Sequence, residues 1–330
     1  MENITFRELF GYENKNIVIT GAFSGMGKAA ARLLNELGAN VYAVCRRNGR
    51  HSTLDFPVKK ILYADLGVKE DLDSLLKQMP NNIHALFFCH GIALNSQGTY
   101  YFEGSNAEEV MKVNLLSTKY LISNIIEKME PSSSISIIAS SGGWNWRENR
   151  ENCQELLDTE TYEDGVKWCM EHHDVIASAY VFSKECLNFY VVANTFNPMF
   201  VEKKIRINCL NPGNTDTGLK SDFGKYTSST HDEAQGIEMI EDIFLKPWDG
   251  YWASPEQMGY PLVCMGSRIF NYMSGQTIFI DYGISNTWLF NPYWFQKEKC
   301  LTALRNSLTS LLPEKQPATT ARVFVRFWTV

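Results

Sequence analysis

The sequence predicts an α/β fold in which helices cover both faces of a doubly wound parallel sheet. Three observations support this prediction. Strand and helix patterns alternate along most of the chain, and the first strand ends in a glycine-rich turn that leads into a helix. The chain also has 330 residues, 45% of them hydrophobic, which is enough to bury a large core and excludes disorder over most of its length.

Short apolar runs predict the strands, and apolar periodicity predicts the helices between them. The expected strands are 17–19, 41–44, 60–63, 85–88, 134–139, 205–210 and 277–280. The expected helices are 26–37, 71–79, 107–129, 180–194 and 255–265, and the first two end before Gly38 and Pro80. Two segments interrupt this alternation: 144–178, rich in charge and tryptophan, and the tail, where 323–328 is an edge strand or a partner contact.

Composition excludes several classes of partner. The net charge of −6 disfavours nucleic acid and anionic membrane, and no apolar run approaches the ~18 residues of a membrane span. Met1–Glu13 lacks the pattern of a secretory signal. The eight cysteines include no CxxC pair, so we expect free thiols and a cytoplasmic location. We expect no metal site, because His172 and His173 are adjacent and would face different sides of a helix as a solvated pair.

The turn Thr20–Gly27 is typical of a pyrophosphate site. Glycine lets the backbone approach an anion closely, and the following helix offers unpaired N–H groups. A tight turn without a ligand is the alternative. At the end of the second strand, where an acid would bind the ribose of NAD, Cys45 is followed by Arg46 and Arg47. Guanidinium groups suit the 2′-phosphate of NADP, although two solvated surface arginines would give the same pattern.

Two further motifs carry chemistry. Asp65-Leu66 follows the third strand, where Asp65 either meets an adenine amino group or caps a helix. Tyr180 and Lys184 are four residues apart and therefore share a helix face. An ammonium near a phenol lowers the pKa of the phenol, which makes tyrosine a usable general acid or base.

Together these motifs resemble the short-chain dehydrogenase/reductase family, and the long insertion resembles its bacterial 3α-hydroxysteroid dehydrogenase/carbonyl reductase branch. The resemblance rests on the glycine turn, Cys89-His90-Gly91, Asn114, Ser140-Ser141, Tyr180 with Lys184, Pro212-Gly213 with Thr217, and Asp281. Two positions depart from the family pattern: Cys89-His90 stand where the family has Asn-Ala before Gly91, and Tyr282 stands where a second glycine is usual. The resemblance implies a Rossmann-like single domain with a helical insertion and a C-terminal extension. The implied boundaries are 1–286 for the catalytic domain, 144–178 for the insertion, 218–260 for the substrate loop and 287–330 for the extension.

The resemblance also implies roles for individual residues. Tyr180 exchanges a proton with the substrate oxygen, Ser141 hydrogen-bonds that oxygen, Lys184 holds the nicotinamide ribose, Asn114 orders a water, and Thr217 binds the carboxamide. The implied cofactor is NADP(H), with NAD(H) as the alternative. The residues expected to bind it are Gly21, Phe23, Ser24, Gly25, Met26, Gly27, Cys45, Arg46, Arg47, Asp65, Leu66, Cys89, His90, Gly91, Tyr180, Lys184, Pro212, Gly213, Thr215 and Thr217.

Aromatic residues are concentrated where the family binds its substrate. They are Phe223, Tyr226, Phe244, Trp248, Tyr251 and Trp252 in the loop, and Trp288, Phe290, Tyr293, Trp294 and Phe295 in the tail. Lining a pocket, they would favour a large apolar ketone or alcohol such as a steroid or bile acid. Packing in the core or at a subunit interface is equally compatible. The alternatives are a reductase of small or acyl carbonyls and a non-catalytic dinucleotide sensor. We expect a homodimer or homotetramer.

Overall fold

The computed structural model describes residues 4–47, 54–93, 107–228, 230–246 and 249–290. The chain divides into two compact units: Met1–Asp222 with Trp252–Ile280, and Phe223–Tyr251 with the chain from Asp281 onward. The aromatic residues 293–295, Trp248 and the expected segment 323–328 lie outside the described residues. The expected boundary between 286 and 287 stays a prediction.

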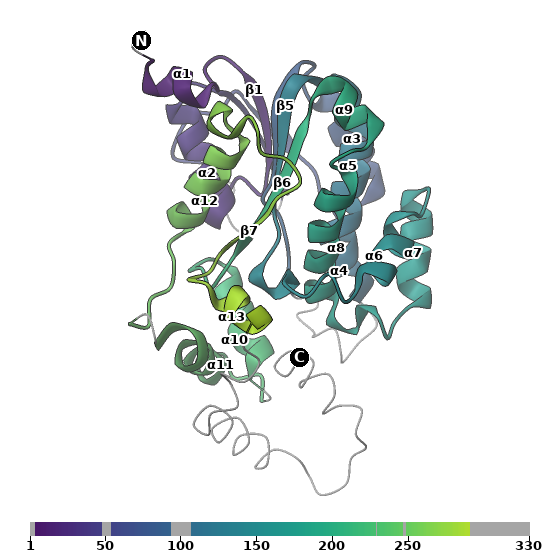
Figure 1. The fold of residues 1–330 in the computed structure, drawn as a ribbon, viewed down its shortest axis with the longest axis vertical. Coiled ribbons are helices and arrows are strands. Elements are labelled where there is room, and N and C mark those ends of the chain that lie inside the picture. The colour runs from purple at the N-terminus through teal and green to yellow at the C-terminus, as the bar shows by residue number, and fades with distance from the viewer. Residues whose placement is uncertain (1–3, 48–53, 94–106, 229, 247–248, 291–330) are drawn as a thin grey trace, which may run out of the picture. The chain divides into compact units, whose positions relative to one another are not determined.

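A seven-stranded sheet organises the first unit, and all its strand pairs are parallel (Figure 1). The strands are β1 (Asn16–Thr20), β2 (Asn40–Cys45), β3 (Lys60–Tyr63), β4 (Ile83–Phe88), β5 (Met129–Ile138), β6 (Arg206–Pro212) and β7 (Thr277–Ile280). Their order is β3-β2-β1-β4-β5-β6-β7, so the chain reverses its winding between β1 and β4. This confirms the doubly wound, Rossmann-like fold, in which ligands bind beyond the carboxyl ends of the strands at the reversal.

Helices cover both faces of the sheet (Figure 1). One face carries α2 (Gly25–Glu36) and α12 (Pro255–Gly266), with the short α1 (Phe6–Phe10) beside them. The other carries α3 (Lys69–Gln78), α4 (Ala107–Met111), α5 (Ser117–Ile125), α8 (Ala179–Asn194) and α9 (Pro198–Lys203).

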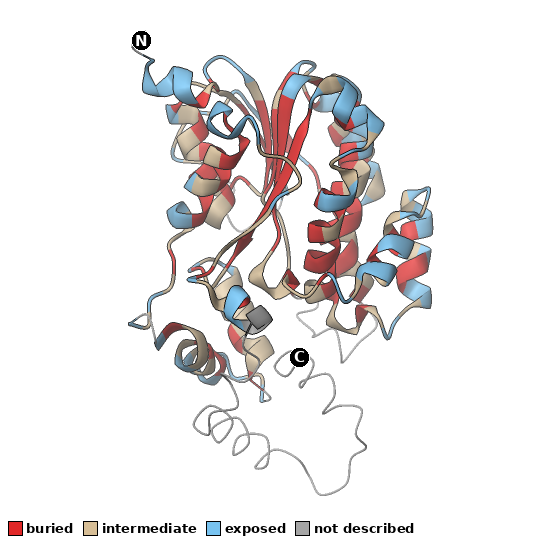
Figure 2. Cartoon of the chain, viewed as in Figure 1, coloured by how far each residue is buried: buried red, intermediate tan, exposed pale blue. Residues whose placement is uncertain are grey.

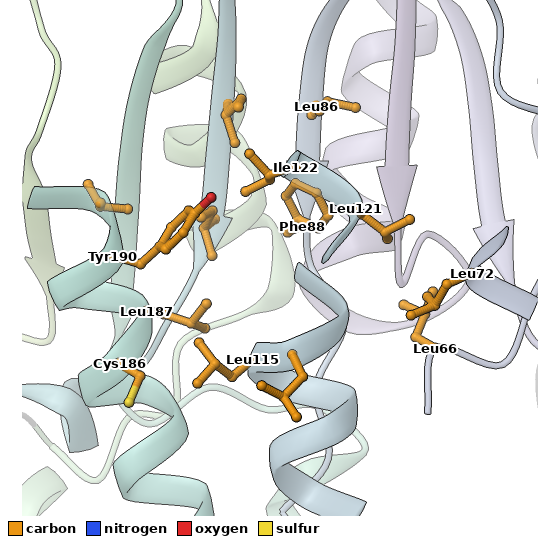
Figure 3. Packing of buried hydrophobic residues seen from close by; sticks show 14 of the residues in the cluster. Leu66, Leu72, Leu86, Phe88, Leu115, Leu121, Ile122, Cys186, Leu187 and Tyr190 are labelled. Atoms are coloured by element: carbon orange, nitrogen blue, oxygen red, sulfur yellow. The ribbon is translucent and has the colours of Figure 1, made fainter. Parts of the chain in front are cut away.

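The central strands β1, β4, β5 and β6 are largely buried, as Figure 2 shows, and apolar side chains on the two faces of the sheet form two clusters. Along β4, Leu86 and Phe88 pack toward α5 and α8, while Ala85 and Phe87 pack toward α2 and α12. Figure 3 shows the first cluster, where Leu86 and Phe88 lie with Leu121 of α5. Burial on both faces explains why the strands appear in the sequence as continuous apolar runs.

The expected continuous helix 107–129 is wrong in detail. It is broken by a π-helical turn, η1 (Lys112–Leu116), continues as α5 and ends in the 3-10 turn η2 (Ile126–Lys128), after which β5 begins at Met129. Apolar periodicity did not reveal the break, because residues on both sides of it remain buried. Such turns are frequent at functional sites.

The insertion 144–178 is helical, as predicted. It contains α6 (Arg150–Leu157), α7 (Tyr162–Glu171) and the 3-10 turn η4 (Ile176–Ser178). Its buried side chains, including Cys153 and Trp168, join the apolar cluster of α8. The solvated pair predicted for His172 and His173 is wrong for His172, whose ring stacks on Trp168 with centroids 4.0 Å apart.

The second unit is described by itself. It contains α11 (Glu233–Ile240), the π-helical turn η5 (Glu241–Leu245) and α13 (Ile284–Phe290), and it receives the end of α10 (Leu219–Thr227). A Cβ on Gly236 would lie 1.7 Å from the carbonyl oxygen of Gly224, so α10 and α11 cross in direct backbone contact. Tyr282 adopts φ +58°, which explains why glycine suits this position.

A buried arginine ties β6 to the end of α12. The Arg206 guanidinium donates four hydrogen bonds of 3.0–3.2 Å to the carbonyls of Met265, Gly266, Ser267 and Phe270. Terminal carbonyls of a helix have no partner within the helix and carry partial negative charge. One cation therefore satisfies several of them at once.

No single helix in the part of the chain that the structure describes is long and apolar enough to cross a membrane. One pair of helices bent by 112°, Tyr162–Glu171 with Ile176–Asn194, meets that test by length and composition only, and most of α8 is buried in the core.

Candidate active site

The glycine-rich turn forms an anion cradle at the start of α2. Gly21 and Gly25 have φ of +65° and +48°, and a Cβ on Gly27 would lie 2.2 Å from the carbonyl oxygen of Gly21. Ser24 precedes the helix and makes no side-chain cap, so no Ser24 side-chain bond occupies the first N–H groups. The residues therefore fit the pyrophosphate of a dinucleotide.

The end of β2 is electropositive. Arg46 and Arg47 are exposed, and the Arg47 guanidinium lies 5.2 Å from the centre of the Tyr63 ring. Among the described residues, neither arginine pairs with a carboxylate. Cys45 is half-buried, and burial raises the pKa of its thiol.

Asp65 forms a local turn instead of capping a helix. Its Oδ1 accepts the backbone N–H of Gly67 at 2.9 Å, and the residue before α3 is Val68. The helix-cap alternative for Asp65 is therefore wrong. Leu66 is buried in the core behind it.

His90 braces the segment after β4. Its Nε2 lies 2.9 Å from the carbonyl oxygen of Val113, which only accepts, so Nε2 carries the proton. Nδ1 then accepts the Thr20 hydroxyl at 2.7 Å. Burial, together with the Lys184 charge, lowers the pKa of His90 to about 3. The neighbouring Cys89 N–H donates to Thr20 Oγ1 at 3.2 Å.

Asn114 lies in the π-helical turn and is buried. Its Oδ1 accepts the N–H of Ile92 at 2.9 Å, and its Nδ2 donates to the carbonyl of Ile92 and to Ser183 Oγ. A Cβ on Gly91 would lie 3.3 Å from Lys184 Nζ and 3.5 Å from Asn114 Oδ1, so this glycine lets Lys184 and Asn114 approach each other.

Tyr180 and Lys184 lie on one face of α8, as predicted. Lys184 is buried, its Nζ donates to the carbonyl of Ile138 at 3.1 Å, and it lies 5.6 Å from the centre of the Tyr180 ring. Burial lowers the pKa of Lys184 to about 8. Burial raises the pKa of Tyr180 to about 12. The lowering expected from Lys184 stays a prediction.

Ser140 hydrogen-bonds Tyr180. The role that the resemblance implies for Ser141, a hydrogen bond to the substrate oxygen, stays a prediction. A hydrogen bond from Ser140 partly offsets the rise in the pKa of Tyr180. Ser140 is extended after β5, with φ −170°, and its Oγ also accepts the N–H of Gly142 at 3.0 Å. Ser141 begins the 3-10 turn η3 (Ser141–Gly143).

The loop after β6 folds back over the glycine turn. Gly213 N–H donates to the carbonyl of Ile280 at 2.9 Å, and Thr215 Oγ1 donates to the Gly213 carbonyl. A Cβ on Gly25 would lie 3.2 Å from Thr217 Cγ2. The predicted pyrophosphate and carboxamide positions are therefore adjacent.

Comparisons with known proteins agree with this arrangement. Residues 15–149 match the family model for short chain dehydrogenase. Coniferyl-alcohol dehydrogenase from Pseudomonas sp. strain HR199 is 25% identical over 276 residues, which cover 84% of this chain and 98% of that protein. The 3-alpha-hydroxysteroid dehydrogenase from Pseudomonas sp. B-0831, solved with NADH, has a TM-score of 0.63 at 18% identity and covers 84% and 98% of the two chains. A 3-oxoacyl (acyl-carrier-protein) reductase from Agrobacterium tumefaciens C58, solved with NADP, has a TM-score of 0.61 at 18% identity and covers 85% and 98%. The sequence over residues 15–149 and the fold over most of the chain are thus similar to those of the short-chain dehydrogenase/reductase family of oxidoreductases.

Proposed function

We propose that the protein is a nicotinamide-dependent oxidoreductase that interconverts a secondary alcohol and a ketone. The observation that carries the proposal is the hydrogen bond between Ser140 and Tyr180, with Lys184 one helical turn beyond Tyr180. A bound nicotinamide cofactor supplies or accepts the hydride.

The residues have complementary tasks. A pKa of about 12 keeps Tyr180 protonated near neutral pH, which suits it to donate a proton to a ketone oxygen. Ser140 hydrogen-bonds the same oxygen, a task the sequence assigned to Ser141. Lys184 holds the nicotinamide ribose, Thr217 binds the carboxamide, and Asn114 orders a water that replenishes protons.

The decisive test separates an enzyme from a dinucleotide sensor. Tyr180→Phe removes the proton donor and keeps the ring, so turnover should fall by about 10² or more. NADPH binding, followed by its fluorescence, should persist. A Tyr180→Phe variant that retains most of its turnover contradicts the role of Tyr180 as proton donor. A wild-type protein that binds NADPH but turns over none of the ketones in the panel described below favours a non-catalytic dinucleotide sensor.

We propose NADP(H) as the preferred cofactor, with NAD(H) as the alternative. The exposed Arg46 and Arg47 at the end of β2 support this choice, because a carboxylate there would repel a 2′-phosphate. Arg46→Asp should reduce the preference for NADPH over NADH by about tenfold or more, and Arg46→Lys, which keeps the charge, should largely preserve it. A lower KM for NADH than for NADPH in the wild type would contradict the proposal.

We propose a steroid or bile acid as the substrate. The support is the aromatic content of the described substrate loop: Phe223, Tyr226, Phe244, Tyr251 and Trp252. Each Å² of apolar surface buried contributes about 25 cal/mol, so a large apolar ligand gains more binding free energy from such a lining than a small aldehyde, which buries less area. The runner-up, a reductase of small or acyl carbonyls, has support from similarity to 3-oxoacyl reductases. A panel of ketosteroids, bile acids and small ketones with NADPH and NADH, followed by nicotinamide absorbance, separates the two.

We propose that two or four copies assemble in a reducing compartment such as the cytoplasm. The described cysteines are free thiols. Phe196 and Met199 are 87% and 43% exposed beside a cavity of about 330 Å³ between α5, α6, α8 and α9, lined by Phe189 and Phe200. A second copy would cover these apolar side chains. Light scattering should show a dimer or tetramer, and Phe196→Ser should lower the mass; an unchanged oligomer contradicts this interface.

A further inference from the structure

Two buried asparagines pair their side chains beside the candidate active site. Asn188 lies on α8 and Asn211 on β6, and both are 0% exposed. Asn188 Nδ2 donates to Asn211 Oδ1 at 2.9 Å, and Asn211 Nδ2 donates to Asn188 Oδ1 at 2.9 Å. These two reciprocal bonds join the helix that carries Tyr180 to the sheet.

Two of the same atoms, Asn211 Oδ1 and Asn188 Nδ2, make a second hydrogen bond each to the two ends of the Ser140–Gly143 loop. Ser140 N–H donates to Asn211 Oδ1 at 3.2 Å, and Asn188 Nδ2 donates to the Gly143 carbonyl at 3.0 Å. Cys209 Sγ donates to Asn188 Oδ1 at 2.9 Å. Every amide oxygen and nitrogen of the pair thus has a partner, as a buried polar network requires.

The Ser140–Gly143 loop packs closely against α8. A Cβ on Gly143 would lie 2.8 Å from Asn188 Nδ2 and 2.8 Å from the carbonyl of Lys184. Asn188 follows Lys184 by four residues, and Lys184 follows Tyr180 by four, so all three lie along one side of α8. The distance from the Ser140 hydroxyl to Tyr180 therefore depends on the contact that Asn188 makes.

We propose that Asn188 and Asn211 are positioning residues that set the Ser140 hydroxyl against Tyr180. The pair touches neither reacting atoms nor, in this proposal, the cofactor; it acts through the backbone of Ser140 and Gly143. This inference rests on the proposed function, because it presumes that both hydroxyls act on one substrate oxygen. A misplacement of about 1 Å in such a site can cost about 10²-fold in rate.

The first experiment measures turnover in Asn188→Leu and Asn211→Leu, using NADPH and the ketone of the panel with the highest turnover. We expect kcat to fall by about 10- to 100-fold while the Kd for NADPH changes by less than about threefold. Asn208→Leu is the matched control, because Asn208 is also buried on β6 and bonds Met273 and Gln276 instead. It should lose stability but keep kcat within about twofold. Equal kcat losses in Asn211→Leu and Asn208→Leu would overturn the proposal.

The double variant separates positioning from stability. Replacing both asparagines by leucine removes the unsatisfied amide that each single variant leaves, so the melting temperature should recover relative to the single variants. Turnover should stay low, because nothing then holds Ser140 and Gly143. Recovery of kcat together with stability would reduce the pair to a structural role.

Amide hydrogen exchange tests the same inference without turnover. In Asn211→Leu, exchange at Ser140 should accelerate at least about tenfold, since its N–H has lost its partner. Asn208→Leu should leave this exchange unchanged. If the leucine variants do not fold, Asn188→Asp replaces them. Its protonated acid keeps one donor and one acceptor, so its kcat should fall at lower pH than that of the wild type. An unchanged pH profile or unchanged exchange refutes the positioning role. A normal Tyr180→Phe rate refutes only the proposed function.

Discussion

Ser140→Ala and Ser141→Ala form a matched pair that tests which hydroxyl acts on the substrate. The Ser140 hydroxyl has two bonds, one to Tyr180 and one from the Gly142 N–H at 3.0 Å, and it faces the reacting oxygen in the proposed mechanism. Loss of a hydrogen bond to the reacting oxygen costs about 10²–10³ in rate, equivalent to about 2.7–4 kcal/mol. Loss of the bond to Gly142 should cost only about 1 kcal/mol of stability.

Ser141→Ala removes a hydroxyl that the proposed mechanism does not use, so its kcat should stay within about twofold of wild type. Both variants are assayed by NADPH absorbance with the best ketone of the panel, after thermal unfolding shows that each is folded. The reasoning is refuted if Ser141→Ala loses more activity than Ser140→Ala, or if the two lose equal amounts.

Three further predictions concern stability. Lys184→Met should stabilise the cofactor-free protein by about 3 kcal/mol below pH 8, because burial lowers the pKa of Lys184 from 10.5 to about 8 and so disfavours its charged form in the folded state. Chemical denaturation should show this difference vanish as the pH approaches 10.5, where the lysine is neutral in both states. Burial raises the pKa of Glu185 to about 7. The free energy of unfolding of the wild type should therefore fall relative to that of Glu185→Gln by up to about 3 kcal/mol as the pH rises from 4.5 through 7. Unfolding free energies of the two proteins that change in parallel with pH would contradict this. Arg206→Met should cost roughly 3 kcal/mol or more by denaturant unfolding, because four carbonyls each lose a hydrogen bond from the guanidinium. The exposed Arg150→Met should change stability by less than about 0.5 kcal/mol.

The parts of the fold that the sequence revealed are those with strong local signals. The strands are apolar because helices cover both faces of the sheet, and the helix with Tyr180 and Lys184 follows from their spacing and its apolar content. The glycine turn was equally clear, because only glycine tolerates the contact between Gly27 and the Gly21 carbonyl.

Features that depend on distant contacts were not visible. Ser140 and Ser141 are adjacent and identical in type, so only the folded structure shows that Ser140 hydrogen-bonds Tyr180. Asn188 and Asn211 are far apart in sequence, so their pairing appears only when α8 packs on β6. The π-helical turn around Asn114 has no periodic signature, because its neighbours are buried either way.

The bracing role of His90 has a consequence for how the site responds to acidity. A histidine close to a lysine would ordinarily add a second charge that changes near neutral pH. Here both ring nitrogens are engaged, by Thr20 and Val113, and burial with the Lys184 charge lowers the pKa of His90 to about 3. The ring therefore stays uncharged across the physiological range and keeps one tautomer. His90 therefore links β1 to the turn that carries Asn114 through hydrogen bonds that do not change with pH in the physiological range.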